Sequence, residues 1–168
     1  RVGNIIQTLK DNGLYENTII IFAGDNGLAV GQHGLMGKQN VYEHSVGVPL
    51  MIKAAAQHTG KKTADLCYLI DVFPTLCDML QLPVPQSVDG ISLLSSLDGK
   101  EPVRDYLYYS YMDNQRGISD GTWKLIEYHV NGKRTTQLFN LKNDPWERDG
   151  LSGQKKYEKT IQRLREKM

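Results

Sequence analysis

The chain has little cysteine, no excess charge of either sign and no long apolar run. Its 168 residues include two cysteines, Cys67 and Cys77, and 20 Lys and Arg stand against 19 Asp and Glu. Two cysteines without a CxxC pair favour buried thiols over a disulfide framework or a zinc site. A net charge of +1 excludes a strongly basic nucleic-acid binder. The longest apolar runs, 19–23 and 66–70, are too short to cross a bilayer, so we expect no nucleic-acid partner and no membrane span.

The first hundred residues have the pattern of an α/β sheet domain. Apolar residues at helical spacing predict a helix that begins at Val2 and ends before Gly13. The β-branched run 18–23 has no polar alternation, which is typical of a central parallel strand covered on both faces. A second short strand is expected over 49–53. A further helix should begin at Asp71, with this residue as its N-cap.

After residue 100 the pattern changes to that of a small α+β unit. Turn dipeptides separate short strand-like runs and predict an antiparallel meander. These runs cover residues 106–112, 117–119, 122–130 and 135–141. Tyr157, Ile161, Leu164 and Met168 form one helical stripe that should pack on the sheet. We therefore divide the chain into residues 1–100, the end of an α/β sheet domain, and residues 101–168, an antiparallel sheet with a C-terminal helix.

Asp25 and Asn26 directly follow the first predicted strand, at the sheet edge where α/β proteins bind ligands. They offer one anionic and one neutral oxygen, which suits Ca²⁺ or Mg²⁺; the alternative is a common Asp-Asn-Gly turn without metal. The glycine-rich stretch that follows contains His33 and Lys38, which could bring a proton donor and a cation to an anionic ligand. The alternative there is an ordinary polar surface loop. Glu43 is either a third ligand or, as we prefer, a structural acid.

Taken in order, these segments resemble one family. The stretch Val2 to Lys38, which reads VGNIIQTLKDNGLYENTIIIFAGDNG and then GQHGLMGK, resembles the second half of a type I, formylglycine-dependent sulfatase of the alkaline phosphatase superfamily. The resemblance continues through nearly the whole chain. It is carried by YE at 42–43, VPL at 48–50, LIDVFPTL at 69–76, DGISLL at 89–94, WKLIEY at 123–128 and QLFNLKNDPWE at 137–147.

The resemblance implies that Asp25 and Asn26 are ligands of a single Ca²⁺, with Mg²⁺ less suited, and that Lys38 contacts the sulfate group. It also implies a substrate or leaving-group contact for His33. The family nucleophile is formylglycine, made from Cys or Ser in a Cys/Ser-x-Pro-x-Arg signature, and neither cysteine and no serine of this chain begins that signature. We therefore expect the nucleophile and the paired aspartates of the metal site in an N-terminal remainder of the same protein.

The expected function is that of the C-terminal portion of a sulfatase, which hydrolyses a sulfated small molecule or glycan when intact and is inactive alone. The alternatives are a phosphonate monoester hydrolase or phosphodiesterase of the same superfamily, or a non-catalytic binding module with a degenerate site. The family implies a periplasmic or secreted location, although no signal peptide is visible from Arg1 onward. One departure is Gly47, which stands where family members commonly have Arg before the Val-Pro pair.

Overall fold

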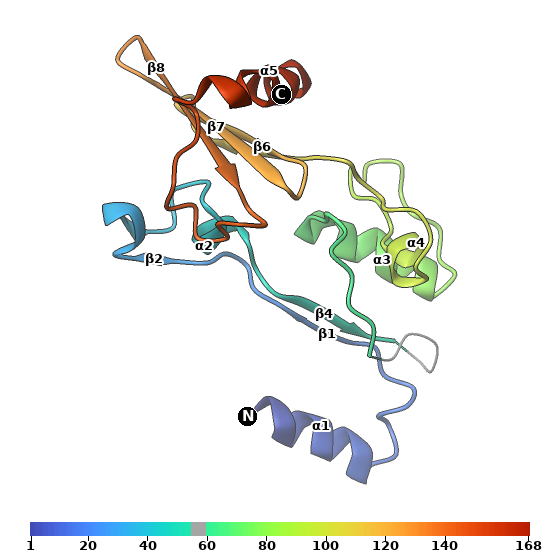
Figure 1. The fold of residues 1–168 in the computed structure, drawn as a ribbon. Helices are drawn as coiled ribbons and strands as arrows, with labels where there is room; N and C mark the ends of the chain where they lie inside the picture. The colour runs from blue at the N-terminus through green and yellow to red at the C-terminus, as the bar shows by residue number, and fades with distance from the viewer. Residues whose placement is uncertain (55–59) are drawn as a thin grey trace.

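A computed structural model describes residues 1–54 and 60–168 of the chain (Figure 1). An N-terminal helix, a two-stranded ribbon, a group of short helices and a four-stranded sheet follow one another along the chain. Among the described residues, no helix combines the length and the apolar character needed to cross a bilayer.

The N-terminal helix α1 covers Val2–Asp11, as the apolar spacing predicts. Gly13 takes the left-handed conformation just after the helix, with φ of 65°, which ends helices readily because glycine has no Cβ. No residue of α1 is buried, and Ile5 is 63% exposed. The apolar stripe of α1 is therefore not covered by the described part of the chain.

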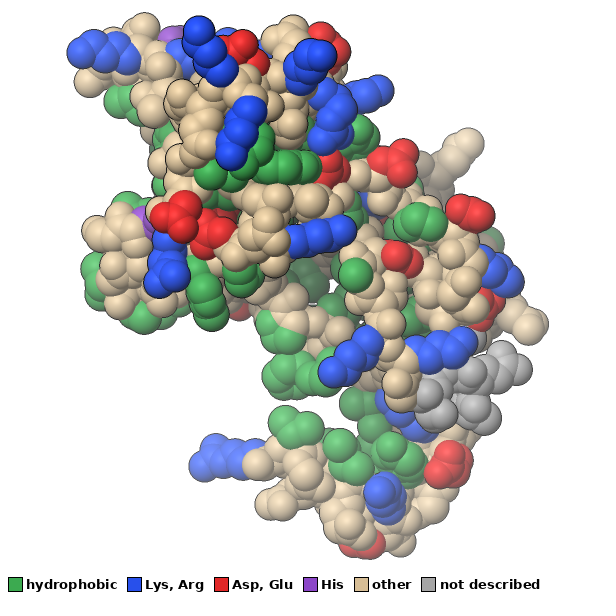
Figure 2. Space-filling model, viewed as in Figure 1, with side chains coloured by type: hydrophobic (Ala, Val, Ile, Leu, Met, Phe, Trp, Pro, Cys, Tyr) green, Lys and Arg blue, Asp and Glu red, His purple; other side chains and the backbone are tan. Residues whose placement is uncertain are grey.

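Strand β1 (Ile20–Ala23) forms an antiparallel pair with β4 (Leu50–Lys53). This differs from the expected parallel strand: in the described residues, β1 has β4 as its strand partner. An apolar run indicates burial but does not encode strand direction, and here the chain returns through 24–49 to lie beside β1. Phe22 and Met51 remain exposed, and Figure 2 shows hydrophobic side chains gathered over this ribbon and on α1.

The loop between β1 and β4 contains four short elements. They are β2 (Ala29–Val30), η1 (Gln32–Gly34), β3 (Met36–Gly37) and α2 (Glu43–Val46). β2 and β3 pair antiparallel, so this glycine-rich stretch folds back on itself before α2 begins.

Three helical segments follow β4: η2 (Leu69–Asp71), α3 (Val72–Met79) and α4 (Leu94–Leu97). Asp71 occupies the N-cap position of α3, but its side chain makes no cap hydrogen bond to that helix. The expected capping role is wrong because Asp71 already has helical backbone angles, whereas a capping residue is normally extended. Cys77 is buried, Cys67 is partly buried, and both are free thiols.

The four C-terminal strands form the predicted antiparallel meander in the order β5-β6-β7-β8. They cover Leu107–Tyr111, Gln115–Ser119, Trp123–Val130 and Lys133–Asn140. The turn between β7 and β8 has Asn131 and Gly132 both at positive φ, the conformation that an Asn-Gly hairpin favours. The turn signals in the sequence therefore indicate the connections of this sheet correctly.

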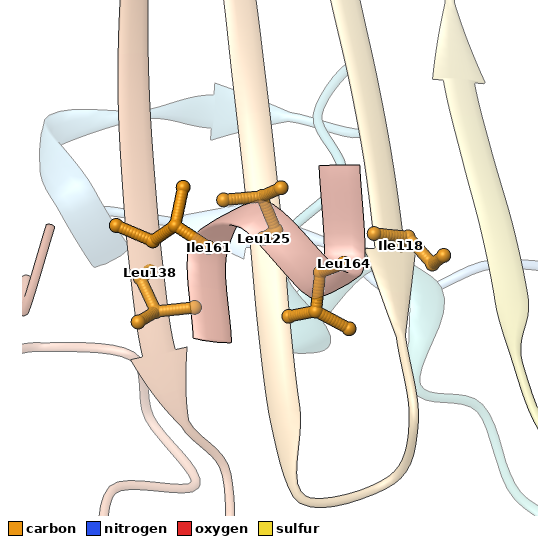
Figure 3. Close-up of a cluster of buried hydrophobic side chains, with 5 residues drawn as sticks. All are labelled: Ile118, Leu125, Leu138, Ile161 and Leu164. Carbon is orange, nitrogen blue, oxygen red and sulfur yellow. The ribbon is translucent and has the colours of Figure 1, made fainter. Parts of the chain in front are cut away.

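Each face of this sheet is covered by a different part of the chain. Helix α5 (Glu158–Lys167), after η3 (Lys155–Tyr157), packs on one face, and Figure 3 shows the buried cluster of Ile118, Leu125, Leu138, Ile161 and Leu164. Met168 of the predicted stripe is 39% exposed instead. On the opposite face, Val41 and Tyr42 pack against Ile126 and Phe139. The segment before α2 is thereby fixed on the C-terminal sheet.

Candidate active site

Asp25, Asn26 and Lys38 line one groove, with a volume of about 850 Å³. Its other walls come from residues 39–50, from residues 65–70 and from β5. The structure thus brings the two predicted metal ligands and the predicted sulfate-binding lysine together. It also places them opposite residues of the C-terminal sheet.

The backbone on both sides of Asp25 and Asn26 is held in place by hydrogen bonds. Gly24 N–H donates to the Pro49 carbonyl at 3.1 Å, and Gly27 N–H donates to the Ser45 carbonyl at 2.8 Å. The turn therefore lies between the start of β4 and helix α2, and Asp25 and Asn26 line the groove.

The side chains of this turn form a small charged centre. Lys38 Nζ lies 3.6 Å from Asp25 Oδ2; the Lys38 side chain is about half exposed and that of Asp25 is largely exposed. A hydrogen bond from the Asn26 backbone and the charge of Lys38 lower the pKa of Asp25, so its carboxylate is ionised at neutral pH. Asn26 Nδ2 donates to the Gly27 carbonyl at 2.8 Å, which leaves Asn26 Oδ1 as a neutral oxygen donor.

These two oxygen donors fit part of a Ca²⁺ shell. An ionised carboxylate and an amide oxygen are ligands that hard cations prefer. The described residues contain no group of three or more His, Cys, Asp or Glu placed to hold a metal ion. Within the described residues, Asp25 and Asn26 are therefore only a partial donor set for such a cation.

We expect the isolated chain to bind Ca²⁺ with millimolar affinity or not at all. Two oxygen ligands fall well short of the roughly six to eight that Ca²⁺ takes. Titration calorimetry of the purified chain measures this directly. Micromolar binding that Asp25→Ala abolishes would show that this chain completes the site by itself.

His33 lies in a different hollow from Lys38. Its backbone has a left-handed φ of 54°, its ring stacks on Tyr42 with centroids 4.0 Å apart, and Nε2 lies 3.2 Å from the Trp146 carbonyl oxygen. Burial and the nearby His33 lower the pKa of His44 beside it. His33 and His44 both line a hollow of about 550 Å³ that shares no lining residue with the groove. A substrate contact for His33 stays a prediction.

Glu43 also lines the groove, but its carboxylate is paired within the protein. Glu43 Oε1 accepts a hydrogen bond from Lys124 Nζ at 2.8 Å, and the Lys124 side chain is fully buried. This matches the preferred interpretation of Glu43 as a structural acid. The neighbouring Gly47 has no room for a side chain, because a Cβ there would lie 2.8 Å from the Glu43 carbonyl oxygen.

Lys124 and Glu147, which no motif in the sequence singles out, meet under the groove with Nζ and Oε1 3.0 Å apart. Burial raises the pKa of Glu147, while the charge of Lys124 opposes that shift. The one signal in the sequence is a lysine between Trp123 and Leu125, in the apolar first half of β7. Nothing local to Glu147 indicates its burial, because its partners lie far away along the chain.

Comparison with known proteins identifies the family. The model of the N-sulphoglucosamine sulphohydrolase C-terminal region matches residues 31–168. The chain belongs to this sulfatase family. One curated relative is an N-acetylglucosamine-6-O-sulfatase of Bacteroides thetaiotaomicron. It is 29% identical to this chain, and the match covers 97% of this chain and 31% of the relative. A choline-sulfatase of Rhizobium meliloti is 32% identical over 90% of this chain and 30% of its own.

Solved structures agree with this assignment. A protein in complex with its substrate D-glucosamine-2-N,6-O-disulfate matches 98% of the sulfatase chain with a TM-score of 0.82 and 27% identity, over 36% of its own length. The phosphonate monoester hydrolase of Agrobacterium radiobacter matches with a TM-score of 0.78 and 27% identity, over 98% of this chain and 38% of its own. The sulfatase chain spans about a third of the length of the proteins it matches.

Proposed function

We propose that this chain is the C-terminal portion of an enzyme that hydrolyses sulfate esters. The observation that carries the proposal is the meeting of Asp25, Asn26 and Lys38 in one groove of a sulfatase-family chain. In the intact protein, Ca²⁺ would supply positive charge at the sulfate group, and a formylglycine in the N-terminal remainder would supply the nucleophile.

The residues of this chain would bind and polarise the sulfate group. Asp25 and Asn26 would hold the cation through their side-chain oxygens. The Lys38 ammonium would contact a sulfate oxygen and stabilise the charge that develops there during S–O bond cleavage. One lysine beside a single divalent ion is sufficient charge for this task, because a sulfate ester carries less negative charge than a phosphate monoester.

The names of the relatives support a sulfated small molecule or glycan as substrate. They include sulfatases of a sugar and of choline, and one structural relative was solved with a disulfated glucosamine. The substrate-contacting loops of such a fold lie partly outside this chain, which spans about a third of its relatives.

A phosphonate monoester hydrolase is the second candidate, because one such enzyme has nearly the same fold over this chain. The intact protein distinguishes the two when both esters are assayed side by side. A kcat/KM that is higher for sulfate esters supports the proposal, and one that is higher for phosphonate monoesters replaces it. Binding without turnover of either would indicate a non-catalytic module.

We expect the isolated chain to hydrolyse neither aryl sulfates nor sulfated sugars, because it has half a metal site and no formylglycine signature. The measurement is sulfate release by the purified chain and by the intact protein under the same conditions. Turnover by the chain alone that disappears in Asp25→Ala would refute this expectation.

A further inference from the structure

A buried group of charges lies beneath the groove, on the face of β7 opposite α5. Lys124 has no exposed side-chain surface and pairs with both Glu43 and Glu147. Its ammonium also lies over the Tyr109 ring, 4.9 Å from the centroid. A lysine this deeply buried is stable as a cation only when it is paired, so the two carboxylates and the lysine form one unit.

This unit fixes the start of helix α2. Glu147, 1% exposed, accepts a hydrogen bond at Oε2 from the Glu43 backbone N–H at 2.6 Å. Tyr42, the residue before the helix, provides no side-chain cap of its own. Because α2 has four residues, most of its backbone groups lack partners inside the helix. Its position therefore depends on contacts from outside: Val41 and Tyr42 hold the segment before it on the sheet, and Glu147 and Lys124 hold its first residue, Glu43.

Helix α2 in turn sets the position of the Asp25–Asn26 turn. Gly27 N–H donates to the Ser45 carbonyl at 2.8 Å. A Cβ built on Gly27 would lie 2.0 Å from the His44 carbonyl oxygen, so the turn rests directly on the helix backbone. A shift of α2 toward the turn must displace it, since there is no space between them, and a shift away breaks the hydrogen bond from Gly27 to Ser45.

We propose that Lys124 is a positioning residue for the metal-binding turn of the intact sulfatase. It acts through Glu43 and Glu147 on α2, and through α2 on Gly27, Asp25 and Asn26. The C-terminal sheet thereby holds the geometry of the active centre without touching substrate. The inference rests on the proposed function in so far as Asp25 and Asn26 bind Ca²⁺.

The test is Lys124→Met in the intact protein, which keeps an unbranched side chain only one atom shorter and removes its charge. We expect the Kd for Ca²⁺, measured by calorimetry, to rise about tenfold to a hundredfold, as for other residues that orient metal ligands. Hydrogen exchange of the Gly27 amide should accelerate, because its bond to Ser45 loosens. This second readout requires neither turnover nor bound metal.

Glu127→Gln is the matched control. Glu127 is on the same strand and 6% exposed, and it pairs with Arg134 and Arg165. As an odd-numbered position of β7 it faces α5, away from Lys124. We expect it to lower thermal stability while leaving Ca²⁺ affinity and Gly27 exchange unchanged. A general loss of stability in the sheet would instead change both variants alike, and that result overturns the proposal.

Glu147→Gln provides a milder variant if Lys124→Met does not fold. It leaves the Lys124–Glu43 pair and a neutral acceptor for the Glu43 N–H, so the same two changes should appear at smaller size. If the wild-type protein binds Ca²⁺ and either folded variant retains both its affinity and its Gly27 protection, the positioning role is refuted. If the wild-type protein binds no Ca²⁺, the proposed function fails instead, and faster Gly27 exchange in the variants still supports the mechanical link to the turn.

Discussion

Under the proposed function, Lys38→Ala in the intact protein should lower kcat/KM by about a hundredfold or more, on the order of 3 kcal/mol of transition-state stabilisation. An ammonium gains more from a sulfate group whose charge is redistributing than from the resting ester, so the loss should fall mainly on catalysis. Lys38 is about half exposed and its ion pair is with a largely exposed Asp25. The thermal stability should therefore hardly change.

Two variants in the same loop serve as controls for Lys38→Ala. Asp25→Ala removes a proposed metal ligand, so excess Ca²⁺ should restore part of its activity, whereas no Ca²⁺ concentration should restore Lys38→Ala. His33→Ala should have the smaller effect, because His33 lies against Tyr42 and Trp146 rather than in the groove. Normal turnover by Lys38→Ala together with loss of activity in His33→Ala would show that the sulfate contact belongs to His33.

The C-terminal half of the fold was predictable because its information is local. Turn residues such as Asn131-Gly132 mark the strand ends, and the stripe containing Ile161 and Leu164 marks the face of α5 that packs. The direction of β1 was not predictable in this way. A β-branched run indicates that a strand is buried. Which strand pairs with it, and in which direction, depends on the path of the chain between the two strands, and no local pattern encodes that path.

In the candidate site, too, the residues that lie close together in sequence were predictable and those with distant partners were not. Asp25, Asn26 and Lys38 lie close in sequence within a recognisable set of segments, and the structure places them in one groove. Lys124 and Glu147 are 81 and 104 residues away from the Glu43 groups that they contact. A sequence pattern cannot pair charges over such distances, because the pairing is decided by the packing of the loop on the sheet.

A second buried charge connects the helical segment to the C-terminal sheet and should be important for stability. Asp71 is fully buried and accepts hydrogen bonds from the backbone N–H groups of Tyr68 and Ile91 at 2.7 and 2.8 Å. It also pairs with the Arg104 guanidinium, which lies over the Tyr68 ring. One carboxylate thus joins residues 68, 91 and 104, just before β5 begins.

Asp71→Ala should therefore destabilise the protein by about 3–5 kcal/mol, the usual cost of removing one partner from a buried ion pair. The substitution leaves Arg104 without its counter-charge and two backbone N–H groups without acceptors, and each unpaired group adds a desolvation cost. Urea unfolding of the chain measures the change. Asp113→Ala is the matched control, because the Asp113 carboxylate is fully exposed and 3.8 Å from Arg116, and its loss should leave the unfolding midpoint unchanged. Equal midpoints for Asp71→Ala and the control would mean that water replaces the lost carboxylate, and that Asp71 does not hold these three segments together.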